Sequence, residues 1–221
     1  MNKTSIIVVA YDRLKISRHI TSACLGTVQA YTDREEYELI LIDNDPVGEL
    51  NRKYNIIELD KHITIQDIGY AASVNMGVKL STVSYPYICL LHNDVFVQEG
   101  WLQTLIQEME SQNGDVIMPG QNPYTREQIK GLRKGENINM WNDAGLMLMR
   151  RSLFEKMGGY DERFRAIYHQ WSFGRRLGEA NSIMCYTNKT IIIHIGAATL
   201  LNDENYFHER HNIESPFTQE L

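Results

Sequence analysis

The sequence predicts an α/β fold, in which one domain is built on a mostly parallel central sheet with helices on both faces. Three apolar runs carry this prediction, and each stops at polar or acidic residues: Ser5–Ala10, Tyr37–Ile42 and Ile88–Leu91. Continuous apolar runs of this length are typical of strands buried on both faces of a parallel sheet. Helical patterns separate the runs, and such strand–helix–strand units place parallel strands side by side through right-handed crossovers.

The first half of the chain alternates strands and helices in the order βαβαβαβα. Ser5–Ala10 is a β-branched first strand, and apolar residues then recur with helical spacing from Leu14 to Val28. The other elements expected in this half are strands over Tyr37–Ile42, Ile63–Ile65 and Ile88–Leu91, and helices over Gly69–Leu80 and Trp101–Met109.

The second half has shorter apolar runs and a long polar segment. Asp115–Met118 is expected to be a short strand, and residues 119–139 a polar loop of the size that often forms a lid or a binding loop. The remaining expected elements are strands over Ala144–Met149, Ile183–Tyr186 and Thr190–Ile195, a helix over Ser152–Met157 with Ser152 as its cap and Gly158-Gly159 as its end, and a helix over Trp171–Leu177 ended by Gly178.

Composition limits the class of protein. The chain has 221 residues without a Pro/Gly/Ser-rich linker or a repeat, so one domain is expected. The formal net charge of −6 argues against a broad surface for polyanions, since nucleic-acid binders usually carry a basic patch. Basic residues still cluster locally, at Lys130, Arg133 and Lys134, at Arg150 and Arg151, and at Arg175 and Arg176.

The cysteines and the apolar segments indicate the compartment. Cys24, Cys89 and Cys185 are odd in number and far apart, which favours buried reduced thiols over a disulfide framework. The chain does not open on a segment of signal-peptide type, and no stretch approaches the roughly 20 apolar residues of a membrane span. We therefore expect a cytoplasmic protein without stable membrane insertion.

Polar side chains follow the central apolar run, where His92, Asn93 and Asp94 come directly after Leu91. Parallel sheets bind ligands just beyond the carboxyl ends of their strands. A carboxylate and an imidazole at this position could hold a divalent cation, and the cation could hold a diphosphate. A single acid after a strand is more often a turn former, but two further strands end at acids, Asp12 and Asp43. Three acids at one edge favour a ligand site.

Six segments in chain order carry a family pattern. They are Ile6–Arg13, Leu39–Asp45, Asp67–Gly77, His92–Val95, Phe154–Phe164 and His194–Gly196. They are similar, in turn, to an opening strand with Tyr-Asn-Arg, a second strand with an acidic turn, a segment with two Asn-x-Gly elements, an Asp-x-Asp or Asn-x-Asp motif, a Gly-Gly-[FY]-Asp-Glu-x-Phe segment and a late His-x-Gly. The chain thus resembles the inverting family 2 nucleotide-sugar glycosyltransferases with the Rossmann-like GT-A fold.

This resemblance implies a domain organisation and an activity. It covers residues 1–199 as a GT-A domain, with a nucleotide-binding half over 1–110, an acceptor-binding half over 111–199 and a tail over 200–221. The implied enzyme is a hexosyl- or pentosyltransferase that moves a sugar with inversion from a nucleoside-diphosphate sugar, preferably a UDP-sugar, to an acceptor hydroxyl. The implied cofactor is Mn²⁺ or Mg²⁺. A saccharide is the expected acceptor and a hydroxylated DNA base the second possibility; the oligomeric state is left open.

The resemblance also implies a nucleotide site. Asp43 would accept a hydrogen bond from the base or ribose, Tyr11 and Asp12 would line the base pocket, and Asn75 would fix the loop near the nucleotide. Taken without the family, Asn75 is equally consistent with a solvated helix residue. The full set expected to bind the nucleotide is Ala10, Tyr11, Asp12, Arg13, Asp43, Asp67, Gly69, Asn75, His92 and Asn93.

The implied metal ligands are Asp94, His194 and His92. A histidine at the end of an apolar strand is more often a core residue, and only the family pattern favours His194 as a ligand. His92 stands where the family has the first acid of its metal motif, and imidazole suits Mn²⁺ better than Mg²⁺. The alternative is that His92 faces away and leaves Asp94 as the sole carboxylate.

A second departure concerns the general base that inverting transfer requires. Most relatives have Glu-Asp shortly after the Gly-Gly-Tyr-Asp-Glu segment, and this chain has His169-Gln170. An amide cannot accept the proton at neutral pH, whereas an unperturbed histidine titrates near pH 6.5. Our hypothesis is that His169 is the base, with Asp143 as the second candidate. The alternative is that no base is retained and the chain is a catalytically weak or inactive nucleotide-sugar binding module.

Overall fold

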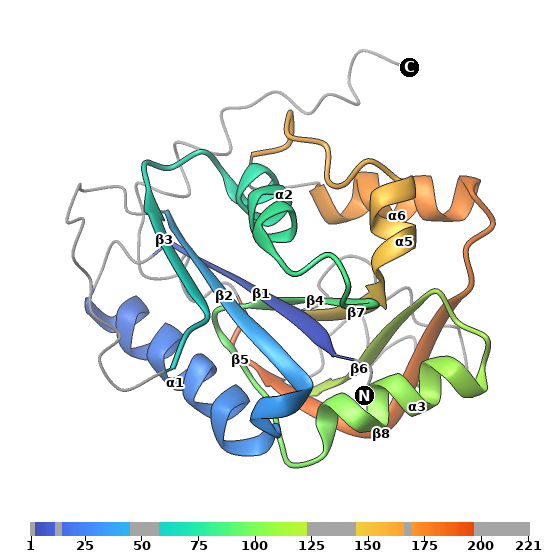
Figure 1. The fold of residues 1–221 in the computed structure, drawn as a ribbon, viewed down its shortest axis with the longest axis horizontal. Coiled ribbons are helices and arrows are strands. Elements are labelled where there is room, and N and C mark those ends of the chain that lie inside the picture. Colours follow the sequence, from blue (N-terminus) through green and yellow to red (C-terminus); the bar gives the residue numbers. More distant parts are fainter. Residues whose placement is uncertain (1–2, 12–14, 45–57, 123–144, 166–168, 197–221) are drawn as a thin grey trace.

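The computed structural model of the chain describes residues 3–11, 15–44, 58–122, 145–165 and 169–196. These residues form one sheet flanked by helices (Figure 1). The elements are β1 Thr4–Ala10, α1 Lys15–Tyr31, η1 Arg34–Glu36, β2 Tyr37–Asn44, β3 Lys61–Ile65, α2 Tyr70–Leu80, β4 Tyr87–His92, β5 Val95–Phe96, α3 Trp101–Ser111, β6 Val116–Asn122, β7 Leu146–Arg150, α5 Arg151–Lys156, α6 His169–Glu179 and β8 Met184–His194.

The sheet has eight strands in the order β3-β2-β1-β4-β7-β6-β8-β5. The first four strands in this order are parallel to one another, and β6 is parallel to β8, whereas β7 and β5 run antiparallel to their neighbours. The register places Ala10 opposite Asp43 and Val9 opposite His92. The carboxyl ends of β1, β2 and β4 therefore meet at one edge, and the predicted α/β class with a mostly parallel sheet is confirmed.

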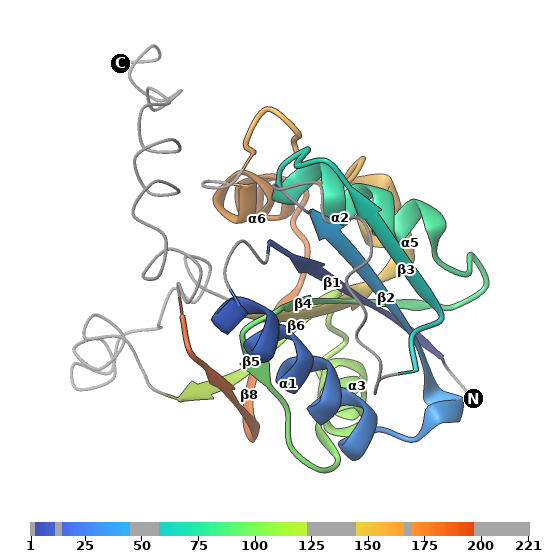
Figure 2. The ribbon, with the colours of Figure 1, turned by 90° about the vertical axis from the view of Figure 1, so that its left-hand side faces the viewer.

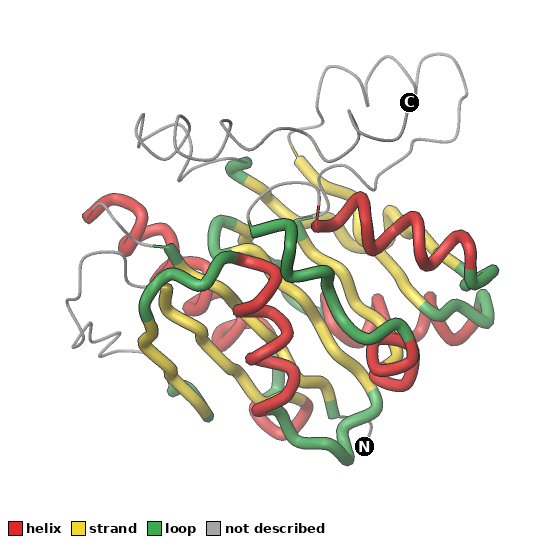
Figure 3. Tube along the Cα trace, turned by 90° about the horizontal axis from the view of Figure 1, so that it is seen from above, coloured by secondary structure: helices red, strands yellow, loops and turns green. Residues whose placement is uncertain are grey.

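Helices cover both faces of the sheet (Figures 1, 2 and 3). Helices α1 and α3 pack on one face with Ile6 and Val8, while α2, α5 and α6 pack on the other with Ile7 and Val9. Successive residues of a strand point to opposite faces, so a strand with a core on both sides is apolar at every position. This explains the continuous apolar runs from which the fold was predicted.

The strand β6 is longer than the sequence analysis predicted. It runs to Asn122, so residues 119–122, expected in the long loop, belong to the sheet, and the rest of that loop lies outside the described residues. Proline is tolerated in this strand because β7 pairs only with Val116 and Ile117, and beyond that point the described partner of β6 is β8 alone.

The two strands expected near the end of the chain are one strand, β8. Its pairing with β6 shifts register between Pro119 and Gly120, which face Thr187 and Ile191. The polar residues between these two partners form an irregularity within the strand, and the sequence analysis interpreted them as a break between two strands.

Two helix boundaries also differ from the predictions. Helix α5 begins at Arg151, with Arg150 as the residue before it and no side-chain cap, so Ser152 is not its cap. Helix α6 begins at His169 and continues through Gly178 to Glu179. A glycine near a helix end weakens the helix without obliging it to stop. Among the described residues, no helix combines the length and apolar character needed to cross a bilayer.

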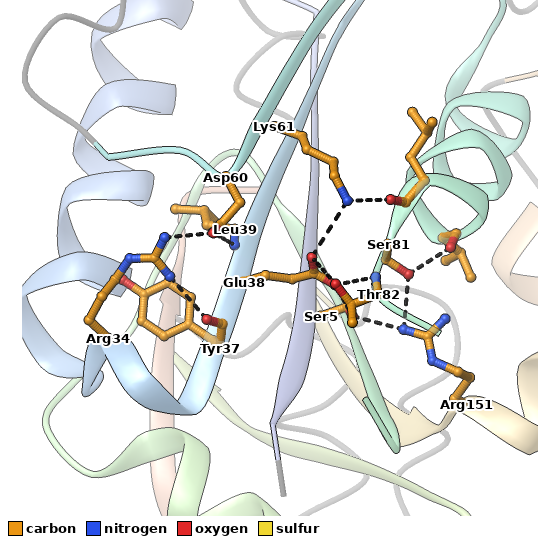
Figure 4. A network of polar contacts seen from close by, with 12 residues as sticks. Ser5, Arg34, Tyr37, Glu38, Leu39, Asp60, Lys61, Ser81, Thr82 and Arg151 are labelled. Atoms are coloured by element: carbon orange, nitrogen blue, oxygen red, sulfur yellow. Dashed lines mark hydrogen bonds and ion pairs between the residues drawn. The ribbon is translucent and has the colours of Figure 1, made fainter. Parts of the chain in front are cut away.

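A buried carboxylate joins the amino-terminal ends of the strands (Figure 4). The Oε1 atom of Glu38 on β2 accepts hydrogen bonds from Ser5 Oγ on β1 and from the Thr82 backbone N–H, both at 2.6 Å. Its Oε2 atom accepts from Thr82 Oγ1 at 2.9 Å and lies 3.8 Å from Lys61 Nζ on β3. Glu38 is 4% exposed, so this charge depends on protein partners.

A buried arginine extends the same network to α5 (Figure 4). Arg151 Nη2 donates to Ser5 Oγ at 2.8 Å and to Ser81 Oγ at 2.9 Å, and its Nε donates to the Tyr85 carbonyl oxygen at 2.6 Å. The network therefore ties three strands, the end of α2 and the start of α5 at the edge of the sheet opposite the candidate ligand edge.

Replacing Glu38 by alanine is expected to lower the free energy of unfolding by about 3–5 kcal/mol, because Ser5 and Thr82 lose their acceptor and the buried Arg151 loses a nearby opposite charge. Urea denaturation measures this change. Glu99→Ala, at an exposed position, is the matched control and should change stability by less than about 0.5 kcal/mol. Equal effects of the two substitutions would contradict the importance of the network.

Candidate functional site

Three side chains with metal-binding atoms meet at the carboxyl edge of the sheet. His92 ends β4, Asp94 lies in the turn before β5, and His194 ends β8. One ligand atom from each lies within 4.8 Å of the others. Asp94 and His194 are buried, and His92 is half-buried. The structure thus brings together the three residues that the sequence analysis expected to hold a cation.

The pairing of β5 with β8 brings two of these residues together. Val95 pairs with His194, and the Ile195 N–H donates to the carbonyl oxygen of Asp94 at 3.1 Å. As a result, His194 Nε2 lies 3.3 Å from Asp94 Oδ1. The pairing of the short strand β5 with β8 thus places the Asp94 carboxylate beside the His194 imidazole.

Gly145 fits between two of the candidate ligands, and the sequence analysis assigned it no role beyond the strand. Its carbonyl oxygen accepts the His92 N–H at 2.8 Å. A Cβ atom at this position would lie 2.8 Å from His194 Nδ1, well inside van der Waals contact. A Cβ would also lie 2.7 Å from Val95 Cγ2, so a side chain at residue 145 would clash with both Val95 and the His194 ring.

The donor set fits a divalent transition cation. The pKa of His92 is lowered to about 4, mainly by burial and to a smaller extent by the neighbouring His194, while Asp94 opposes both effects. His92 is consequently neutral near pH 7, the form in which imidazole binds metals. Two imidazoles and one carboxylate suit Mn²⁺ better than Mg²⁺, which prefers oxygen ligands.

Aromatic rings form a row that leads away from the metal-binding atoms. The row runs Tyr160–His169–Tyr70–His92–His194, with centroid separations of 5.3, 4.5, 5.4 and 5.4 Å. His169 is 7% exposed and is separated from His92 by the Tyr70 ring. Burial raises the pKa of both tyrosines, so their hydroxyl groups remain protonated.

Gln170, the residue after His169, directly contacts the candidate ligand His92. Gln170 Nε2 lies 3.0 Å from His92 Nε2, within hydrogen-bonding distance. The sequence analysis identified Gln170 only as an amide in place of a family acid. Its contact with His92 depends on how α6 lies over the sheet, which no local pattern reveals.

Asn75 connects α2 to the loop that precedes α6. Its Nδ2 donates to the Tyr160 carbonyl oxygen and to Glu162 Oε1, both at 2.9 Å, and its Oδ1 accepts from the Tyr160 N–H at 2.8 Å. A Cβ atom on Gly159 would lie 2.5 Å from Asn75 Oδ1. Asn75 thus holds the backbone of this loop, and the glycine admits its close approach.

The loop before α2 is held by the same partner segment. Asp67 Oδ1 accepts from the Gly69 N–H at 2.9 Å, and the Asp67 carbonyl oxygen accepts from Arg165 Nη2 at 2.9 Å. The Tyr70 N–H donates to the Arg165 carbonyl oxygen at 2.5 Å. Two of the family-like segments therefore bind each other, and together they position Tyr70 beside His92 and His169.

The other expected nucleotide ligands lie at the same edge or outside the described residues. Asp43 is fully buried, with Oδ2 3.7 Å from His62 Nε2 on the neighbouring strand. Asn93 donates from Nδ2 to Thr21 Oγ1 on α1 at 2.8 Å. Ala10 is the buried last residue of β1, Tyr11 is half-buried beyond it, and Asp12, Arg13 and Asp143 lie outside the described residues.

Comparisons with known proteins agree with this geometry. A family model described as "Glycosyl transferase family 2" matches residues 5–174. No curated protein matches the chain in sequence.

Among solved structures, S. aureus TarS 1–349 has a TM-score of 0.65 at 14% identity, and the match covers 90% of this chain and 62% of TarS 1–349. TarS 1–349 in complex with UDP has a TM-score of 0.65 at 15% identity, covering 86% of this chain and 60% of that one. The S. aureus TarS structure has a TM-score of 0.65 at 14% identity, covering 98% of this chain and 44% of that one. The chain therefore spans less than two thirds of the length of these TarS structures, and the likeness establishes the fold.

The contact between Gly159 and Asn75 makes a testable prediction. Gly158 and Gly159 both have positive φ values, 72° and 76°, but a Cβ on Gly158 would meet nothing within 4 Å. Both substitutions carry the cost of placing alanine at a positive φ, and only Gly159→Ala also overpacks the site. Gly159→Ala is therefore expected to lower the free energy of unfolding by about 1–3 kcal/mol more than Gly158→Ala. Urea denaturation compares the two.

Asn75→Ala and Gly159→Ala together form a double-mutant cycle. With the Asn75 side chain removed, the extra cost of Gly159→Ala should largely disappear. Additive effects of Asn75→Ala and Gly159→Ala would show that the two residues do not interact.

Proposed function

The chain belongs to glycosyl transferase family 2, and from this premise we propose that it moves a sugar, with inversion, from a nucleoside-diphosphate sugar to an acceptor hydroxyl in a cation-dependent reaction. The observation that carries the proposal is the convergence of His92, Asp94 and His194 at the carboxyl edge of the sheet. Ligands of open α/β sheets bind at this edge.

We propose a UDP-sugar as the donor. The solved structure of TarS in complex with UDP supports this choice, because the two proteins share a fold although only 15% of residues are identical. The nucleoside would lie over the ends of β1 and β2, where Ala10 and Asp43 face each other. The nucleotide-binding half would comprise residues 1–110 and the acceptor-binding half residues 111–199.

His92, Asp94 and His194 would hold the cation, with Mn²⁺ favoured over Mg²⁺ by the two imidazoles. When bound, a divalent cation neutralises charge on the leaving diphosphate. Asp94 supplies the negative charge, and its short distance to His194 fixes both side chains before a donor arrives. Burial of this pair excludes water that would otherwise compete for the cation.

His169 is our candidate for the general base, and Asp143 is the second candidate. The position of the His169 ring, 4.5 Å from Tyr70 in the row that leads to His92, supports a role near the reacting sugar. Gln170 lacks a proton-accepting group at neutral pH, so the adjacent histidine is the remaining titratable group at this point of α6. If neither residue acts, the chain is a weak or inactive nucleotide-sugar binding module.

A saccharide hydroxyl is the proposed acceptor. The net charge of −6 disfavours a DNA acceptor, although a hydroxylated DNA base is the second possibility. The two differ in salt dependence, since phosphate contacts weaken steeply as salt is added. The three buried free cysteines support a reaction in a reducing compartment such as the cytoplasm.

A panel of sugar nucleotides tests the function. With Mn²⁺ present, a UDP-sugar is expected to raise the melting temperature and, with a saccharide acceptor, to release UDP. Asp94→Asn should lower the rate of release by about 100-fold or more, because a cation supplies several kcal/mol of charge stabilisation. The matched control, Glu99→Gln, exchanges the same groups at an exposed position and should have no effect.

The absence of any response of the wild-type protein to every sugar nucleotide would contradict the proposal. Donor binding without transfer to any acceptor would instead favour the binding module.

His169→Ala is expected to lower turnover by about 100- to 10,000-fold, the usual contribution of a general base, with little change in donor affinity. Steady-state kinetics and a donor titration by calorimetry separate the two effects. His19→Ala, at an exposed position of α1, is the control. Unchanged turnover in His169→Ala would exclude this residue as the general base and leave Asp143 as the candidate.

A further inference from the structure

We infer that Gln170 is a positioning residue of the cation site, which holds His92 by its Nε2 atom so that Nδ1 is the atom offered to the cation. The inference rests on the proposed function, and it gives a role to the amide that stands in place of an acid of the family pattern. Gln170 would act through His92 and need not touch the donor or the acceptor.

The contact that carries this inference is direct. Gln170 Nε2 lies 3.0 Å from His92 Nε2. An imidazole has two nitrogen atoms, so a hydrogen bond at one of them leaves the other for a metal ion. A ligand histidine usually has its second nitrogen held in this way, which fixes the tautomer and the ring orientation.

The surroundings of His92 leave its ring little freedom to present the other nitrogen. The Tyr70 and His194 rings each lie 5.4 Å from it and stand edge-on, at interplanar angles of 77° and 72°. The backbone N–H of His92 is fixed by Gly145. A half-turn of the ring about its Cβ–Cγ bond would put the carbon Cε1 where Nε2 lies and would break the contact with Gln170.

Helix α6 holds Gln170 in place. Phe173, one turn further along the helix, is fully buried. Arg176 donates from Nη1 to the Met157 carbonyl oxygen at 2.7 Å and from Nη2 to the Gly159 carbonyl oxygen at 2.6 Å. The last turn of α6 is therefore anchored to the same loop that Asn75 fixes, and Gln170 lies in the first turn of this anchored helix.

An amide suits this position because it carries both a donor and an acceptor. Without a cation, the Gln170 amide nitrogen donates to Nε2, and the ring proton is on Nδ1. With a cation on Nδ1, the proton is on Nε2, and the amide oxygen of Gln170 accepts it. A leucine of similar size could serve neither tautomer, and a glutamate could serve only the second.

The tautomer can be read directly by ¹⁵N NMR of histidine-labelled protein, with Zn²⁺ as a diamagnetic probe. In the metal-free wild type we expect His92 to carry its proton on Nδ1. Addition of Zn²⁺ should move the proton to Nε2 and shift the Nδ1 resonance. Coordination of Zn²⁺ through Nε2, or no change at His92, would overturn the inference, whether or not the variants below fold.

Substitutions give the second readout, which is Mn²⁺ affinity measured by calorimetry without any donor. Gln170→Leu should weaken Mn²⁺ binding by about 10- to 100-fold and leave His92 as a mixture of tautomers. Gln170→Glu should restore affinity, because a carboxylate accepts from Nε2–H. Gln107→Leu, at an exposed position of α3, is the matched control and should bind Mn²⁺ as the wild type does.

A purely packing role would give the opposite ranking, with Gln170→Leu tolerated and Gln170→Glu impaired, and this result would overturn the inference. A wild type that binds no cation would overturn it as well. Cation binding with the expected tautomers, but without a response to any sugar nucleotide, would support the role of Gln170 and contradict only the proposed function.

Discussion

The candidate site depends on one long-range constraint, the pairing of the short strand β5 with the end of β8. Val95 and His194 face each other there, although they are far apart in the sequence. A two-residue strand cannot stabilise such a contact alone, since closing a long loop costs more entropy than a few hydrogen bonds return. The pairing is therefore stable only because the rest of the sheet holds β8 in place, and the metal-binding atoms meet only in the completed fold.

A second constraint joins the segments on either side of the site. Asn75 binds the backbone of Tyr160, and Arg165 binds the backbone of Asp67 and Tyr70. Both segments belong to the family pattern, and each supplies the other with hydrogen-bond partners. The residues of the two segments therefore have a structural reason to occur together. Their mutual hydrogen bonds hold Tyr70 where its ring contacts both His92 and His169.

The sequence was a good guide wherever a local rule decides the structure. The central strands were predicted because a double-sided core demands apolar residues at every position, and a ligand edge was expected because several strands end at polar residues; His194 was placed there only by the family pattern. The continuity of β8, the contact of Gln170 with His92 and the fit of Gly145 against His194 escaped prediction. Each of these depends on the register of segments distant in sequence, and composition and spacing carry no information about register.

The two departures from the family pattern, at His92 and at Gln170, are in contact with each other in the fold. His92 stands in place of the first metal-binding acid, Gln170 stands in place of an acid on α6, and the two side chains touch. A carboxylate at either position would add a negative charge beside Asp94, whereas the observed pair is neutral near pH 7 and keeps a hydrogen bond. The side chain at position 170 therefore contacts a candidate cation ligand. The candidate base His169 is the neighbouring residue on the helix, and the Tyr70 ring contacts both it and His92.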